Sequence, residues 1–183
     1  MGYLRLVRAP ASRPAADSGC IEAFDRELDF IFETLRRLGA ATREIEDLAQ
    51  EVFFVLHKNW PMVDLDRPLR PYLFGIAYRL VCANRRRRAR EIPAPDLDME
   101  DAGFSPEGTL ERKESVRLLM AALERVPIPR RAVLIMHDLE DIPIVDIARS
   151  LSLTRFGTYA RLRKARAELT TAVGRLMLAR GRK

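Results

Sequence analysis

The sequence predicts an all-α protein made of two small helical domains joined by a flexible acidic linker. Apolar residues recur at spacings of three and four in several segments, whereas no convincing alternating pattern of a strand occurs. The stretch from Glu91 to Leu110 carries six acidic residues, three prolines and no Lys or Arg. Residues 1–90, 91–110 and 111–183 have net charges of +4, −6 and +8, so the overall charge of +6 combines two cationic modules.

The composition limits the class of protein. With 183 residues, the interruption leaves two units of about 70 residues, each of which is a minimal helical core. No apolar run approaches the ~20 residues of a membrane-spanning helix, so we expect a soluble protein without membrane insertion. Residues 1–18 lack the features of a secretory signal and are predicted to be a mobile N-terminal tail. Cys20 and Cys82 give no disulfide framework, which suits a reducing cytoplasm.

Two helices are predicted in the first module before residue 61. The apolar residues from Ile21 to Leu38 follow spacings of 3, 4, 3, 4 and 3, and Gly39 can end that helix. The next helix is expected to open with Thr42 as its N-cap and to end at Asn59. Beside its apolar stripe, this helix has a second face on which acidic residues accompany a phenylalanine: Asp47, Gln50, Glu51 and Phe54.

A third helix is predicted from Tyr72 to Arg88, after a loop from Trp60 to Pro71 that contains three prolines. The helix begins apolar and finishes with four consecutive arginines, Arg85 to Arg88. Cations at a helix C-terminus compensate the helix dipole, and they equally suit contact with nucleic acid. The arginine run alone leaves both interpretations open.

The second module shows the spacing of a helix-turn-helix. A stripe from Val116 to Val126 predicts one helix, and a short helix from Arg130 to Asp138 follows Pro127-Ile128-Pro129. Two further helical patterns, residues 144–151 and 154 to about 173, are separated only by Ser152-Leu153.

The last helix is predicted to present a basic face with aromatic residues. Thr158, Leu162, Ala165 and Leu169 follow spacings of 4, 3 and 4 and should turn inward. Arginine at the start of such a helix can donate two hydrogen bonds to guanine in the major groove, while its neighbours bind phosphates. A basic amphipathic helix that reads no DNA is the alternative. The outward residues are Arg155, Phe156, Tyr159, Arg163 and Lys164.

The sequence gives little support for an enzyme. His57 and His137 are isolated, and neither has a cysteine at a spacing that would build a zinc site. There is no phosphate-binding glycine loop, dinucleotide fingerprint or Gly-x-Ser-x-Gly motif. We therefore expect no catalytic residue, no metal and no cofactor.

Two groups of motifs resemble the extracytoplasmic-function (ECF) group of bacterial sigma-70 factors. Asp47-Leu-Ala-Gln-Glu-Val-Phe53 and Tyr72-Leu-Phe-Gly-Ile-Ala-Tyr-Arg79 resemble region 2 of that family. Three other segments resemble region 4 of the family: Val126-Pro-Ile-Pro-Arg-Arg-Ala-Val-Leu134, residues 138–148 and residues 159–166. The likeness spans roughly residues 22–172. It predicts region 2 in 19–90, a linker in 91–110, region 4 in 111–175 and a basic C-terminal tail in 176–183.

The resemblance implies a sigma factor that binds core RNA polymerase, directs it to promoters and assists melting, without catalysis of its own. The acidic linker would run near the RNA exit path, and an anti-sigma factor that masks the same surfaces is a partner typical of such systems. The residues that would contact the polymerase are Asp47, Gln50, Glu51 and Phe54. The residues that would bind the minus-ten element are Trp60, Tyr72, Tyr78, Arg79, Arg85 and Arg86. Those that would bind the minus-35 element are Arg155, Phe156, Tyr159, Arg163 and Lys164.

Three positions depart from the family pattern. Ser152 stands where many members have glycine, Gly157 lies inside the recognition helix, and Ala83 replaces a frequent aspartate. Glycine costs about 1 kcal/mol of helix propensity there, so the register of the recognition helix is open. The alternative function is a free-standing helix-turn-helix regulator that binds DNA without docking on core polymerase.

Overall fold

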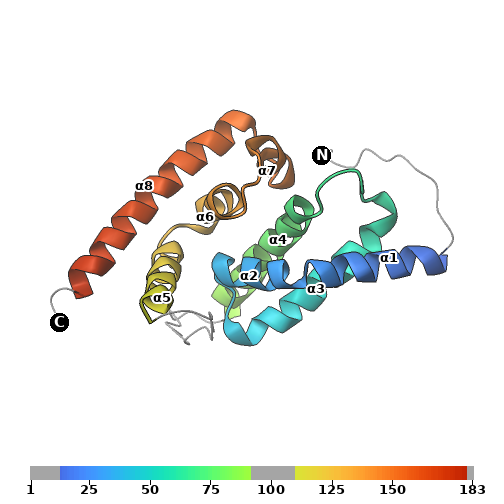
Figure 1. Ribbon diagram of the computed structural model, residues 1–183, viewed down its shortest axis with the longest axis horizontal. Coiled ribbons are helices and arrows are strands. Elements are labelled where there is room, and N and C mark those ends of the chain that lie inside the picture. The colour runs from blue at the N-terminus through green and yellow to red at the C-terminus, as the bar shows by residue number, and fades with distance from the viewer. Residues whose placement is uncertain (1–12, 92–109, 181–183) are drawn as a thin grey trace.

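The computed structural model describes residues 13–91 and 110–180, which fold into α-helices joined by short turns and contain no strand. This confirms the predicted all-α class. Figure 1 shows α1 to α4 gathered in one half of the molecule and α5 to α8 in the other. The helices are α1 (Arg13–Arg26), α2 (Leu28–Leu38), α3 (Ile45–Asn59), α4 (Arg70–Glu91), α5 (Leu110–Glu124), α6 (Ile128–Leu134), α7 (Ile144–Ser150) and α8 (Arg155–Arg180).

The first predicted helix is interrupted at Glu27, which separates α1 from α2. Helix α1 begins at Arg13, inside the stretch for which a tail was predicted, and residues 1–12 lie outside the described residues. Gly39 ends α2 in the left-handed conformation, with φ of 85°, as predicted. Its amide donates to the Arg36 carbonyl and the Ala40 amide to the Leu35 carbonyl, the pair of hydrogen bonds that closes a Schellman motif.

The prediction that Thr42 caps the second helix is wrong. Thr42 begins a 3-10 turn, η1 (Thr42–Glu44), and no side-chain hydrogen bond caps either this turn or α3. Helix α3 ends at Asn59 and continues into a second 3-10 turn, η2 (Trp60–Met62). Its core-facing stripe is buried as predicted, and comprises Ile45, Leu48, Ala49, Val52 and Leu56.

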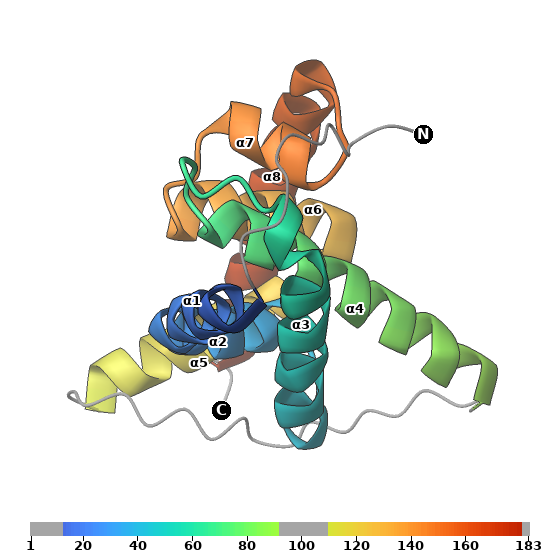
Figure 2. The same ribbon diagram turned by 90° about the vertical axis from the view of Figure 1, so that its right-hand side faces the viewer.

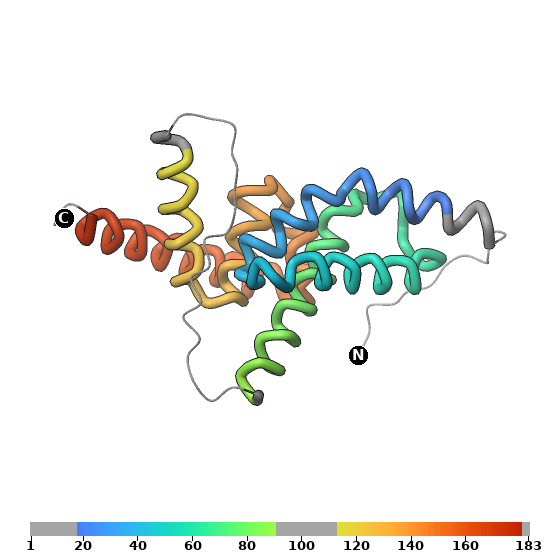
Figure 3. The backbone as a smooth tube through the Cα atoms, turned by 90° about the horizontal axis from the view of Figure 1, so that it is seen from below, coloured from blue at the N-terminus to red at the C-terminus, as the bar shows by residue number. Residues whose placement is uncertain are grey.

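Helix α4 is longer than the predicted span of 72–88, and its two ends have different surroundings. The first half is buried through Leu73, Phe74, Ile76 and Ala77 and packs against α2 and α3. The second half carries the arginine run and projects away from the other helices, as Figures 2 and 3 show.

The predicted linker falls largely on residues 92–109, which lie outside the described residues. In the second half, the short helix expected from Arg130 to Asp138 begins earlier, at Ile128, since proline is tolerated in the first helical turn. It also ends earlier, at Leu134, and the chain continues in a π-helical turn, η3 (Ile135–Leu139). Helix α8 runs through to Arg180, so residues 176–180 are helical where a tail was predicted.

The buried apolar residues form one cluster that extends from Cys20 in α1 to Ala165 in α8. Helices α2 and α4 of the first half contact α5, α6 and α7 of the second. The two predicted modules are therefore packed against each other in this structure. None of the helices described is long and apolar enough to span a bilayer.

Candidate nucleic-acid interface

Helix α8 begins at Arg155, and Thr154 caps it. The Gly157 amide donates to the Thr154 hydroxyl oxygen over 3.0 Å, which satisfies one of the free donors of the first turn. A Cβ atom at Gly157 would lie only 3.0 Å from the same oxygen. Gly157 thus occupies the first turn, where it leaves room for the cap, and the helix start is fixed.

The outward face of α8 carries the five residues predicted for it. Phe156 is 84% exposed and Tyr159 is 60% exposed, which is unusual for aromatic side chains of this size. On the opposite side Thr158, Leu162 and Ala165 are buried, as predicted, and Leu169 is partly buried. The exposed set at the start of the helix is Arg155, Phe156, Tyr159, Arg163 and Lys164.

The turn between α7 and α8 requires an unusual backbone conformation. Ser152 has φ of 54°, in the left-handed region that favours glycine. The Leu153 amide donates to the Ala148 carbonyl over 2.7 Å and closes the turn. Ile147 and Ala148 are buried beneath α8, as the helix-turn-helix prediction expected.

Two ion pairs hold the middle of α8 against the preceding elements. Arg166 donates to both carboxylate oxygens of Asp138 in η3, over 2.6 and 2.9 Å. Arg130 in α6 pairs with Glu168 at 2.7 Å. The hydrogen bonds from Arg166 hold the pKa of Asp138 below its ordinary value, with His137 adding to the effect against partial burial. These contacts fix the angle at which α8 presents its exposed face.

The Asp138 pair predicts a pH dependence of stability. Because the pKa of Asp138 is lower in the folded than in the unfolded chain, its stabilisation is present at neutral pH and is lost as the pH falls below about 4. Asp138→Asn should therefore lower the unfolding free energy at pH 7 by about 1 kcal/mol or less, the range of accessible ion pairs. Urea unfolding at pH 7 and pH 3 measures this. If Asp138→Asn lowers the unfolding free energy equally at pH 7 and pH 3, the ion pair does not cause the pH dependence.

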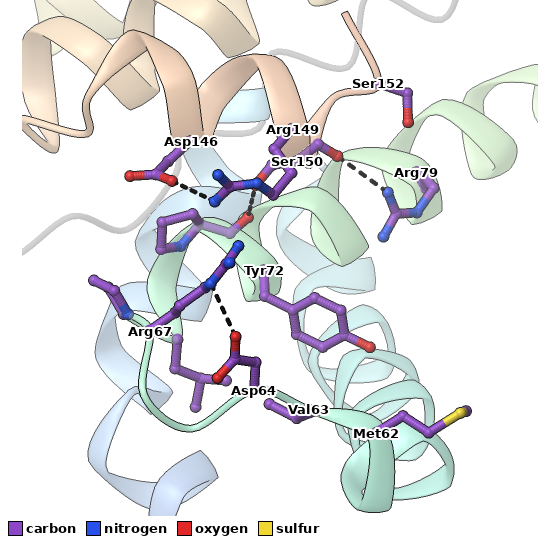
Figure 4. A pocket seen from close by; sticks show the side chains of 13 residues that line it. Met62, Val63, Asp64, Arg67, Tyr72, Arg79, Asp146, Arg149, Ser150 and Ser152 are labelled. Carbon is purple, nitrogen blue, oxygen red and sulfur yellow. Dashed lines mark hydrogen bonds and ion pairs between the residues drawn. The ribbon is translucent and has the colours of Figure 1, made fainter. Parts of the chain in front are cut away.

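A pocket of about 300 Å³ lies beside the loop that precedes α4 (Figure 4). Tyr72 and Arg79, two of the residues predicted for the minus-ten element, line it. Burial raises the pKa of Tyr72, against the opposing effects of the Arg79 charge and a hydrogen bond with Asn59. The side facing α4 is formed by α7 and the turn after it, through Asp146, Arg149, Ser150 and Ser152.

The other four residues predicted for the minus-ten element lie outside this pocket. Trp60 is partly buried, and its ring approaches Gly19 of α1. Tyr78 is half-buried; burial and the adjacent Cys82 thiol raise its pKa, against the charges of Arg161 and Arg86. Arg85 and Arg86 are both exposed, and Arg85 also donates to the Gly39 carbonyl over 2.9 Å at the end of α2.

The second face of α3 is accessible along its whole length. Asp47, Gln50 and Glu51 are exposed, and Phe54 is 65% exposed. Phe54 lies next to Phe53, with ring centroids 6.0 Å apart, and Phe53 packs edge-on against Phe24 at 5.0 Å. The exposed aromatic ring is thus supported by an aromatic contact that reaches the core.

Residues 13–91 and 110–180 contain no group of three or more His, Cys, Asp or Glu side chains that could hold a metal ion. Two surfaces remain with chemistry suited to nucleic acid: the start of α8 and the loop that leads into α4. The exposed face of α3 combines acidic and aromatic side chains.

Family comparisons match both halves of the chain. Residues 23–91 match the model described as Sigma-70 region 2, and residues 117–169 match the one described as Sigma-70, region 4. Each match lies in one half of the structure and includes the candidate residues of that half.

Several curated relatives have recognisable similarity over most of the chain. ECF RNA polymerase sigma factor SigM of Mycobacterium tuberculosis is 26% identical over 167 residues, which cover 91% of this chain and 83% of that protein. RNA polymerase sigma factor NccH of Alcaligenes xylosoxydans xylosoxydans is 24% identical, covering 75% and 77%. ECF RNA polymerase sigma factor SigW of Bacillus subtilis is 23% identical, covering 77% and 81%.

Two solved structures share the fold across both halves. CnrH, solved in complex with the cytosolic domain of CnrY, gives a TM-score of 0.60 at 22% identity and covers 87% of this chain and 93% of that chain. The sigma factor RpoE of Bartonella quintana, solved with the anti-sigma factor NepR, gives 0.66 at 21% identity and covers 84% and 98%.

Proposed function

The chain belongs to the ECF group of sigma-70 RNA polymerase sigma factors, and on this premise we propose which of its surfaces meet the polymerase and the promoter. The observation that carries the proposal is the separate exposure of three chemically different faces. One is acidic and aromatic, one lies beside a loop pocket, and one is a basic helix start. The first two faces lie within residues 23–91, which match region 2, and the third lies within residues 117–169, which match region 4.

The face of α3 docks on core RNA polymerase. Its carboxylates at Asp47 and Glu51 suit a basic partner surface, and exposed Phe54 suits an apolar contact. Exposed aromatic residues among polar ones are typical of interface centres, where a few anchors contribute most of the binding free energy. Gln50 lies between them and can exchange hydrogen bonds with the partner.

The loop before α4 and the start of that helix take the unpaired non-template strand of the minus-ten element. Tyr72 can stack on a base, and Arg79 can pair with a phosphate. The arginine-rich end of α4 projects from the rest of the molecule and suits the DNA backbone, through exposed Arg86 among others. Arg85 is exposed beside Arg86 and can also meet the backbone, whereas Trp60, whose ring lies near Gly19 of α1, contributes to this surface mainly through the fold.

The start of α8 reads the minus-35 element in the major groove. Arg155, Arg163 and Lys164 supply cations, while Phe156 and Tyr159 supply apolar and hydroxyl contacts. The Thr154 cap and the Asp138–Arg166 pair hold this face rigid, which favours base recognition over loose phosphate binding.

The protein would act in the cytoplasm beside the polymerase, without catalysis of its own. An anti-sigma factor is a further proposed partner, because the CnrH and RpoE structures that share this fold were solved with CnrY and the anti-sigma factor NepR. Such a partner would control when the three surfaces become available.

Capture of genomic DNA fragments, with and without core polymerase, separates this function from that of a free-standing regulator. A sigma factor should retain specific fragments only when core enzyme is present. Specific and tight retention by the protein alone, unchanged on adding core, would favour the regulator and contradict the proposal.

A further inference from the structure

Helix α4 begins with a cation, although the start of a helix carries the positive end of its dipole and favours anions. Arg70 is the first residue of α4, and the first turn of this helix contains no acidic residue that could compensate the charge. Arg70 therefore occupies a position that the helix itself disfavours. Its contacts outside α4 account for it.

The Arg70 side chain reaches the junction of α1 and α2, 43 residues earlier in the chain. Its Nε donates to Oε2 of Glu27 over 2.7 Å, and its Cζ lies 5.0 Å from the centroid of the Phe30 ring. Phe30 is buried in α2, and the Glu27 side chain is only 16% exposed. The carboxylate fixes one edge of the guanidinium and the ring covers its face, so the two contacts together hold its position and its plane.

Glu27 is the residue at which the first predicted helix is interrupted, and its carboxylate is committed to Arg70. It is the N-cap residue of α2, with φ of −103° and ψ of 9°, but its side chain makes no capping hydrogen bond. Its backbone closes the junction, because its amide donates to the Phe24 carbonyl and its carbonyl accepts from the Ile31 amide, each over 3.0 Å. The break between α1 and α2 thus places a carboxylate where the start of α4 can meet it.

The loop before α4 is tied to α1 at its other end as well, and Figures 1 and 3 show the loop beside that helix. Trp60 opens η2, which packs on α1, and a Cβ atom at Gly19 would lie 3.8 Å from the Trp60 ring. Between the two ends, an exposed ion pair joins Arg67 to Asp64 over 2.9 Å and shapes the loop locally. The position of the loop therefore depends on its ends, and both are held by α1 and its junction with α2.

Tyr72 lies in the first turn of α4, two residues after Arg70, and its amide donates to the Leu69 carbonyl over 3.0 Å. Contacts that fix the start of α4 therefore also fix Tyr72. We propose that Arg70 is a positioning residue for promoter melting. The clamp formed by Arg70, Glu27 and Phe30 holds the loop and Tyr72 where they take the unpaired strand, and Arg70 does this without itself binding DNA. The proposal rests on the minus-ten assignment in the proposed function.

Hydrogen exchange measured by NMR in the full-length protein tests the clamp without DNA. Methionine keeps the length of a side chain and removes its charge, so Arg70→Met and Glu27→Met each break the ion pair. Each variant should make the Tyr72 and Leu73 amides, which both donate to the Leu69 carbonyl, exchange about fivefold faster, as expected when contacts of this kind are lost. Amides of α8 should exchange at the wild-type rate. Unchanged exchange at Tyr72 and Leu73, or an equal increase in both halves, would overturn the clamp.

Promoter melting distinguishes positioning from direct contact with DNA through the sign of one effect. The assay is the permanganate reactivity of unpaired thymines in a promoter fragment recovered by capture with the holoenzyme. Glu27→Met removes a negative charge near a surface assigned to DNA, so charge alone predicts higher reactivity, whereas loss of the clamp predicts lower reactivity. Glu22→Met removes an exposed acidic residue of α1 outside the clamp and is the matched control, which should not lower the reactivity. If Glu27→Met raises the reactivity or leaves it unchanged, the positioning role is wrong.

The double variant measures whether Glu27 and Arg70 act as one unit. Arg70→Met should lower the reactivity as much alone as together with Glu27→Met, because the second substitution has no clamp left to break. Additive losses would contradict the shared role.

Tyr72→Ala tests the minus-ten assignment separately from the clamp. This variant should lower the permanganate reactivity of the holoenzyme complex, because Tyr72 is the residue that the clamp positions. Wild-type reactivity in Tyr72→Ala, together with faster exchange of the Leu73 amide in Arg70→Met, would contradict the minus-ten assignment. That failure is distinguishable from failure of the clamp, which the exchange rates measure directly.

Discussion

Alanine at both Asp47 and Glu51 should reduce the affinity of this sigma factor for core RNA polymerase by roughly thirtyfold, about 2 kcal/mol. The two carboxylates are exposed one turn apart on α3 and would meet a basic partner surface. Removing a charge from a close interfacial pair costs about this much, because the partner charge loses its compensation. Titration of labelled core enzyme with the variant measures the change.

A matched control separates this effect from net charge. Glu22→Ala with Glu46→Ala also removes two exposed carboxylates from the first half, but neither belongs to the proposed docking face. This variant should bind core within about twofold of the wild type, as expected when surface charges outside an interface are lost. If both double variants weaken binding equally, the docking face is assigned wrongly.

Arg163→Ala should leave core binding unchanged and weaken promoter recognition by the holoenzyme. One lost bidentate contact to a base is worth ~1–3 kcal/mol, or about fivefold to 150-fold in affinity. Arg175→Ala is the control, since Arg175 is exposed on the same helix but lies twelve residues further along, about 18 Å away. Competition binding of holoenzyme to promoter DNA with mutated minus-35 elements reports the difference.

The outcome also identifies what Arg163 reads. A base contact predicts that the variant loses discrimination at one minus-35 position, whereas a phosphate contact weakens all sequences alike. Loss of core binding together with promoter binding would indicate misfolding, which circular dichroism detects in an all-α protein. If Arg175→Ala lowers the promoter affinity of the holoenzyme as much as Arg163→Ala does, the proposed position of the interface is wrong.

Local patterns in the sequence predicted most of the fold. The stripe ending at Gly39 and the inward residues of α8 depend on spacings of three and four, which report directly on one helix face. The break at Glu27, the 3-10 turn at Thr42 and the π-helical turn at 135–139 were not predicted. The break at Glu27 lies inside an apolar stripe whose spacings of three and four continue across it, so periodicity could not reveal this break.

The candidate surfaces were predictable to different extents. Exposure of the α3 face and of the start of α8 agrees with the helical registers inferred from sequence. The sequence did not determine at which residue α8 begins, since a glycine in the first turn is compatible with several helical registers. The hydrogen bond from the Gly157 amide to the Thr154 hydroxyl oxygen shows that Thr154 caps the helix. The family resemblance, and no local pattern, grouped Trp60 and Arg85 with the minus-ten residues. In the structure the Trp60 ring lies near Gly19 of α1, whereas Arg85 is exposed and donates one hydrogen bond to the Gly39 carbonyl.

The contact between the halves was beyond prediction from one sequence. Arg131 meets Leu38, and Ser150 meets Pro71, across separations of 93 and 79 residues that no local pattern records. Two signals existed nonetheless: Gly75 inside a long helix, and Arg131 directly before the apolar run from Ala132 to Met136. Each marks a position where the helix itself does not explain the residue.

Run-off transcription from a promoter pool with purified core polymerase, followed by sequencing of RNA 5′ ends, measures whether this protein directs the polymerase to promoters. We expect discrete new start sites that appear only when the protein is added, share motifs upstream, and diminish with the Asp47 and Glu51 double variant. An unchanged set of start sites, together with specific DNA binding by the protein alone, would contradict it.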